Sequence, residues 1–166
     1  NHGFYYSTLG GWYEQAPPAI HFRQPYWEHW KPFADYVRRL SYIMSQGKHV
    51  ADVAILYPIT TIHANCSGGD HFSRAADETA NDTFSLARLI YKNGTDFDFM
   101  DDQSLSRAEV SDGKLKVSGL EFPVLLLPPM TTIRTETLQK IKELYNGGGI
   151  VVSFRRLPNA SPENGR

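Results

Sequence analysis

Apolar residues follow a helical period over residues 32–46. They recur at intervals of three and four, as Phe33, Tyr36, Val37, Leu40, Ile43 and Met44, while polar residues take the opposite face. Pro32 suits the first turn of a helix and Gly47 suits its end. This segment therefore predicts an amphipathic helix.

Four short apolar runs predict buried strands, at residues 50–57, 97–100, 122–127 and 150–154. Helical periods over 83–93 and 134–146 lie between them, and a small hairpin is predicted around residues 115–117. Apolar strands that alternate with amphipathic helices indicate right-handed crossovers. The predicted fold is a flavodoxin-like α/β domain of three layers with a mainly parallel sheet.

Residues 59–81 lack a stable period and predict a poorly ordered loop. His63, Asp70, His71 and Asp77 fall within it, but their spacing matches no metal-binding motif, so we expect solvated loop residues and no metal. The single Cys66 excludes an internal disulfide.

The first 30 residues mix aromatic side chains with glycine and proline, which is typical of irregular loops that pack on a neighbouring surface or border a pocket. Residues 155–166 are polar and predict a linker. The predicted domains are an aromatic interface loop at 1–30, the α/β domain at 31–154 and the linker. The absence of an initiator methionine favours a piece of a larger protein.

Charge and hydropathy exclude two classes of partner. The formal net charge of the 166 residues is -1, and like charges do not cluster, so nucleic acid is not expected to bind. Residues 124–130 form the longest apolar stretch, and two prolines interrupt it, so no membrane span is predicted. The compartment is left open, with the bacterial periplasm or the cell exterior as candidates.

The residues that follow each strand argue against a cofactor and against a catalytic residue in the chain. No glycine-rich phosphate loop is present, so neither a nucleotide nor a flavin is expected. An amidotransferase of this layout needs a cysteine on the turn after a strand. Pro128, Pro129 and Met130 occupy that place instead.

Two stretches resemble a known family. Residues 3–58, and above all YVRRLSYIMSQGKHVADVAILYP at 36–58, resemble large bacterial α-L-rhamnosidase-like glycoside hydrolases of family 106, at the junction of the barrel and an amidotransferase-like domain. Residues 112–152 are similar to the continuation of that domain and to the trimerisation domain of family 42 β-galactosidases. The resemblance implies an accessory domain without its nucleophile. It implies that residues 1–30 are the tail of the catalytic barrel, as the alternative to an aromatic interface loop. It also implies two catalytic carboxylates on a barrel, a role that no motif assigns to Glu14 or Glu28.

Three hypotheses remain open. In the first, the chain is a non-catalytic domain that supports a glycosidase barrel or forms its oligomer contact; its partners are the remainder of the parent enzyme and, through it, a carbohydrate. In the second, the aromatic loop borders the sugar pocket through five substrate-binding residues, His2, Tyr5, Tyr6, Trp12 and Glu14. In the third, the chain is a stand-alone flavodoxin-like binding protein.

Overall fold

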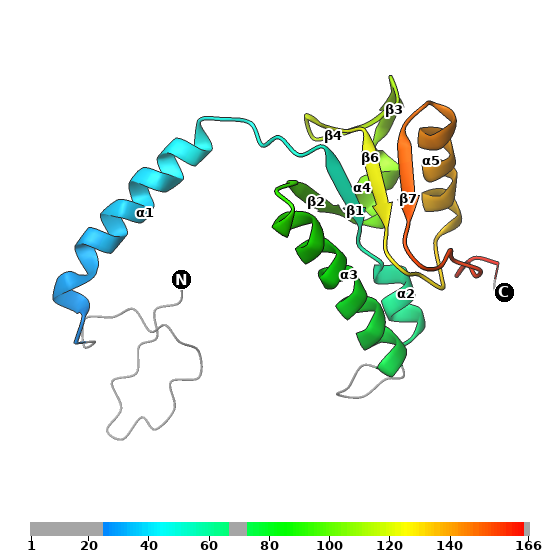
Figure 1. Ribbon diagram of the computed structural model, residues 1–166, viewed down its shortest axis with the longest axis horizontal. Coiled ribbons are helices and arrows are strands. Elements are labelled where there is room, and N and C mark those ends of the chain that lie inside the picture. The colour runs from blue at the N-terminus through cyan, green and yellow to red at the C-terminus, as the bar shows by residue number, and fades with distance from the viewer. Residues whose placement is uncertain (1–24, 67–72, 165–166) are drawn as a thin grey trace. The chain divides into compact units, whose positions relative to one another are not determined.

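The computed structural model describes residues 25–66 and 73–164. The chain divides into two compact units, Asn1–Lys48 and His49–Arg166, and each is described by itself (Figure 1). The domain boundaries predicted from the sequence stay predictions.

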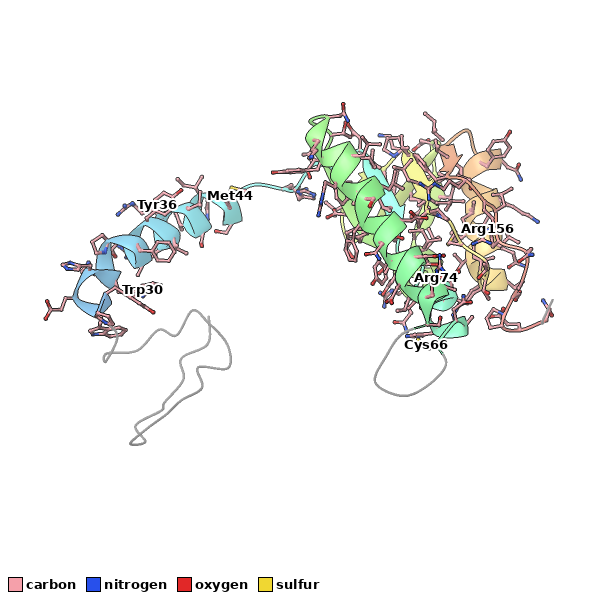
Figure 2. All side chains as sticks on the ribbon, turned by 60° about the horizontal axis from the view of Figure 1, so that its bottom comes forward. Trp30, Tyr36, Met44, Cys66, Arg74 and Arg156 are labelled. Carbon is pink, nitrogen blue, oxygen red and sulfur yellow. The ribbon has the colours of Figure 1, made fainter. Side chains whose placement is uncertain are left out.

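The described residues of the first unit form one long helix. A 3₁₀ turn, η1 (Trp27–His29), leads into α1 (Trp30–Ser45), which confirms the predicted amphipathic helix. Trp30 packs against Phe33 with ring centroids 4.9 Å apart. Within this unit the apolar face of α1 stays exposed, and Tyr36 and Met44 can be followed along it in Figure 2.

The second unit is built on a parallel sheet of four strands. These are β1 (Val53–Leu56), β2 (Phe97–Met100), β6 (Val124–Leu127) and β7 (Ile150–Ser153), in the order β2-β1-β6-β7. Every neighbouring pair is parallel. The predicted parallel sheet is confirmed.

Helices cover both faces of this sheet and complete three layers (Figure 1). On one face, α3 (Arg74–Lys92) packs Leu86 and Ala87 against β1 and β6. On the other, α4 (Asp102–Arg107) and α5 (Thr135–Asn146) bury Leu105 and Leu144. The predicted three-layer α/β class is confirmed.

The loop predicted at residues 59–81 is wrong where the structure describes it. Residues Ile59–Ala64 form α2, and α3 begins at Arg74, with the Ser73 side chain capping the Ala76 N–H. The inner face of this first part of α3 consists of Ala76, Thr79 and Thr83, which carry no strong apolar signal. The two threonine hydroxyls donate to carbonyls one turn earlier, so they can be buried at little cost.

The strand predicted at residues 122–127 is divided between two sheets at Pro123. Its first residue belongs to an antiparallel sheet of β3 (Glu109–Ser111), β4 (Lys114–Val117) and β5 (Leu120–Phe122). A proline has no N–H for a sheet ladder, which favours a break at this position. Leu115 and Phe122 anchor the small sheet in the α4 and α5 core.

The strand predicted as buried at residues 150–154 is an edge strand that is open on one face. Ile150 is 55% exposed and Val152 is 38% exposed, although both have the residue type of a covered strand. Their exposure is the clearest disagreement between the apolar pattern of the sequence and the packing of the unit.

Substitution of Gly149 tests how closely α5 packs against the small sheet. A Cβ atom at Gly149 would lie 2.7 Å from Leu144 Cγ and 2.8 Å from the carbonyl oxygen of Gly113, both in closely packed surroundings. We expect Gly149→Ala to lower the free energy of unfolding by about 1–3 kcal/mol, measured by urea denaturation. Gly47→Ala is the control, since nothing lies within 4 Å of its added Cβ. Equal stability of the two variants would contradict this packing.

Candidate functional site

The carboxyl ends of the strands are the place where an open α/β sheet binds ligands. Three connections meet there: α2 follows β1, α4 follows β2, and the segment 128–134 joins β6 to α5. The side chains that these connections bring together determine what this edge can do.

Thr61 joins the β1 connection to the β6 connection. Its hydroxyl donates to the Thr132 carbonyl oxygen at 2.7 Å and accepts from the Thr132 N–H at 3.1 Å. The Thr131 N–H lies 3.3 Å from the same oxygen. A hydroxyl acts as a nucleophile only when a base takes its proton. Because this proton is already bonded to a backbone carbonyl, Thr61 has a structural role.

Asp102, which follows β2, links this connection to α2 after β1 and to α5 after β6. Its carboxylate accepts hydrogen bonds from the Thr60 hydroxyl at 2.6 Å and from the Thr137 hydroxyl at 2.7 Å. Arg134 Nε lies 4.0 Å from it. Asp102 is only 7% exposed, and Thr137 is fully buried. These bonds therefore fix the starts of α2, α4 and α5 to one another.

Asp101, the residue before Asp102, caps α4. Its carboxylate accepts hydrogen bonds from the side chain and backbone of Ser104, with the Ser104 N–H at 2.6 Å. These bonds hold the pKa of Asp101 below its usual value. Asp101 therefore serves as a helix cap, and Asp102 serves as a buried hydrogen-bond acceptor.

The polar groups at this edge are satisfied by one another. Across residues 25–66 and 73–164, every buried side-chain nitrogen or oxygen atom has a hydrogen-bond partner. Pro128, Pro129 and Met130, which follow β6, are buried. The arrangement holds the domain together, and it offers a ligand no unsatisfied buried group.

The chain after β7 also returns to this edge. Ala160 forms an isolated parallel β-bridge with Thr132, and the Ile133 N–H donates a hydrogen bond to the Ala160 carbonyl oxygen at 3.0 Å. The Glu163 carboxylate accepts from the Thr135 N–H at 3.2 Å. The segment predicted as a linker thus makes specific contacts over part of its length.

A second polar pair lies where β7 ends. Arg155 Nη1 contacts both carboxylate oxygens of Asp82, at 2.9 and 2.8 Å. The φ angle of Arg155 is 57°, and the Arg156 N–H bonds the Phe154 carbonyl at 2.6 Å, which is the pattern of a strained γ-turn. The pair borders a shallow groove of about 170 Å³, whose apolar lining is Leu86, Leu89, Pro129 and Phe154.

The five predicted substrate-binding residues, His2, Tyr5, Tyr6, Trp12 and Glu14, lie outside the described residues. Glu28 is exposed on η1. Cys66 is exposed after α2, and His63 is exposed on that helix. Among the residues that the structure describes, no group of three His, Cys, Asp or Glu side chains could hold a metal ion. Nor is any helix in those ranges long and apolar enough to cross a bilayer.

Sequence reasoning missed the threonine network, although a signal for it exists. Thr60 and Thr61 follow β1, and Thr131 and Thr132 follow β6, so two adjacent strands are each succeeded by a Thr-Thr pair. Hydroxyls at the ends of neighbouring parallel strands lie at the same edge and can bond to each other or to backbone. Asp102 carries no comparable signal, because its partners come from distant segments.

Substitution of Asp102 tests the network. We expect Asp102→Ala to lower the free energy of unfolding by about 2–3 kcal/mol, because the buried Thr137 hydroxyl would lose its acceptor. Asp102→Asn keeps one acceptor oxygen, so its loss should be smaller. The control is the exposed Asp52→Ala, with an expected change of less than about 0.5 kcal/mol. Chemical denaturation would measure all three, and a neutral Asp102→Ala would contradict the structural role.

Comparisons with known proteins agree with the resemblance seen in the sequence. A putative beta-glucuronidase of Formosa agariphila is 30% identical over 138 residues, which is 82% of this chain and 10% of that protein. The chain thus spans about a tenth of the length of this relative. A crystal structure of a beta-galactosidase from Bifidobacterium adolescentis is 16% identical and aligns with a TM-score of 0.48, over 69% of this chain and 44% of that one. The family model for alpha-L-rhamnosidase matches residues 16–165, and the chain therefore belongs to this family of glycoside hydrolases.

Proposed function

We propose that this chain is a non-catalytic α/β part of a larger glycoside hydrolase, which it supports through contacts with the remainder of the enzyme. The observation that carries the proposal is the closed carboxyl edge. Thr60, Thr61 and Thr137 bond to Asp102 or to backbone there, and prolines follow β6 where a nucleophile would stand.

Family membership supplies the reaction class of the parent, and the length of the relative supports a fragment. A relative in which this chain corresponds to a tenth of the length has room for a separate catalytic domain. Such a domain would carry the two carboxyl groups that glycoside hydrolysis requires, held roughly 5–10 Å apart. A stand-alone flavodoxin-like protein fits neither observation.

The apolar face of α1 supports the bracing role. Within its unit Phe33, Tyr36, Ile43 and Met44 are each more than half exposed. An amphipathic helix of 16 residues gains most of its stability from packing of the apolar face, so this helix needs a surface that the described residues of the first unit do not provide. We assign residues 1–30 to the tail of the catalytic barrel or to a loop against it.

The proposal includes a carbohydrate as the substrate of the parent enzyme. Contacts of His2, Tyr5, Tyr6, Trp12 and Glu14 with that substrate stay a prediction, as does the formation of homo-oligomers. The names of the family and of the relatives suggest which glycosides to test: α-L-rhamnosides, β-glucuronides and β-galactosides.

The test compares the purified 166-residue chain with the protein encoded by its complete reading frame. We expect the complete protein to hydrolyse at least one of the three aryl glycosides and the chain to hydrolyse none, because positioned carboxylates are lacking. Glu14→Gln and Glu28→Gln variants of the chain serve as controls for trace activity. Turnover by the isolated chain that either substitution abolishes would overturn the accessory role.

A further inference from the structure

The two faces of the parallel sheet are covered to different extents. On the face of α4 and α5, Ala54, Leu56, Leu125 and Leu127 are all at most 3% exposed. On the face of α3, the strand register forms two rows across the sheet. Those rows are Phe97, Val53, Val124 and Ile150, and Phe99, Ile55, Leu126 and Val152.

Exposure in these rows rises from the centre of the sheet to β7. In the second row Ile55 is 0% exposed, Leu126 is 8% exposed and Val152 is 38% exposed. In the first row the exposure rises from 8% at Val53 to 55% at Ile150. At the other edge of the sheet, Phe99 on β2 is 42% exposed. The α3 helix therefore covers the central strands β1 and β6, and it leaves side chains on both edge strands open.

The width of the sheet explains why one helix is insufficient. Four strands at about 4.8 Å spacing place the outer strand axes about 14 Å apart, whereas a helix with its side chains is about 10 Å wide. A face of this width takes two helices side by side. Parallel sheets are found almost only where both faces are covered.

On the β7 side of α3, the apolar residues that are exposed or partly exposed are Leu89, Ile150, Val152 and Phe154, and we call these four residues the β7 strip. Leu89 is 57% exposed on α3, and it lines the same groove as Phe154. Ile150, Val152 and Phe154 alternate along the chain, so they point to one side. The Asp82–Arg155 ion pair lies beside the strip at the carboxyl end of β7.

We propose that an amphipathic helix from a part of the parent polypeptide outside residues 1–166 lies on the β7 strip, parallel to α3. This inference rests on the proposed function in one respect, namely that the parent chain is longer. About nine tenths of the relative lie outside the matched segment, so such a helix has a source.

The size of the strip favours a tethered helix over a second copy of the chain. Stable contacts between separate proteins bury about 800 Å² on each partner and involve about 20–30 residues a side. Four side chains fall far short of that. A segment of the same polypeptide needs a much smaller contact, because its effective concentration is already high.

The occupant can be identified by photo-cross-linking in the protein encoded by the complete reading frame. p-Benzoyl-phenylalanine replaces Val152, and the cross-linked peptide is identified by mass spectrometry. We expect a peptide from outside residues 1–166, with apolar residues at intervals of three and four. The matched control places the same probe at Tyr145, which is 68% exposed on the opposite helix α5, and this control should not capture that peptide.

Three results would overturn the proposal: a cross-link confined to residues 1–166, a cross-link to a second copy, or no cross-link in the folded complete protein. A reading frame that encodes only these 166 residues would also overturn it, together with the proposed function. The three cross-linking results do not depend on hydrolysis, so the inference can fail on them while the proposed function stands.

A conservative substitution gives an independent measurement. Val152→Thr keeps the shape of the side chain and its strand propensity but places a hydroxyl under the docked helix. We expect the melting temperature of the complete protein to fall by about 3 °C or more, with a much smaller change in the isolated chain. Equal shifts in both proteins would mean that residues of this chain already cover the strip.

Discussion

The hydrogen bonds that close the carboxyl edge of the sheet are the constraint on which the rest of the domain depends. Through Thr61 and Asp102 they tie together the segments that follow β1, β2 and β6, and so they fix where α2, α4 and α5 begin. The low polarity around a buried carboxylate strengthens each bond and makes an unpaired partner costly. Among the described residues, no buried side-chain polar group at this edge is left without a partner.

Two apolar surfaces, one in each unit, differ from this edge because their side chains are exposed. The apolar face of α1 in the first unit and the β7 strip in the second have the composition of buried structure, but the described residues of their own unit do not cover them. Exposed apolar surface of this kind usually marks an interface. A structure whose buried polar groups are paired at the carboxyl edge of the sheet, and whose apolar side chains are exposed elsewhere, is suited to support a larger enzyme.

The sequence predicted the parts of the fold whose periodicity is unambiguous. The cores of all four parallel strands, α1 and α5 were found because their apolar positions follow a single period. The start of α3 was missed because Ala76, Thr79 and Thr83 form its inner face, and hydroxyl groups bonded within a helix leave no hydropathy signal. The role of Asp102 could not be predicted, since its partners Thr60 and Thr137 lie 42 and 35 residues away. The predicted sugar contacts fall outside the described residues and stay predictions.

Hydrogen–deuterium exchange on the isolated chain and on the complete protein tests the central claim most directly. If the chain is a supporting domain, the amides of α1 and β7 should exchange more slowly in the complete protein, while those around Thr61 and Asp102 should be equally protected in both. Equal exchange of α1 and β7 in the two proteins would contradict the account. Faster exchange at Thr61 and Asp102 in the isolated chain would show that the edge does not close by itself.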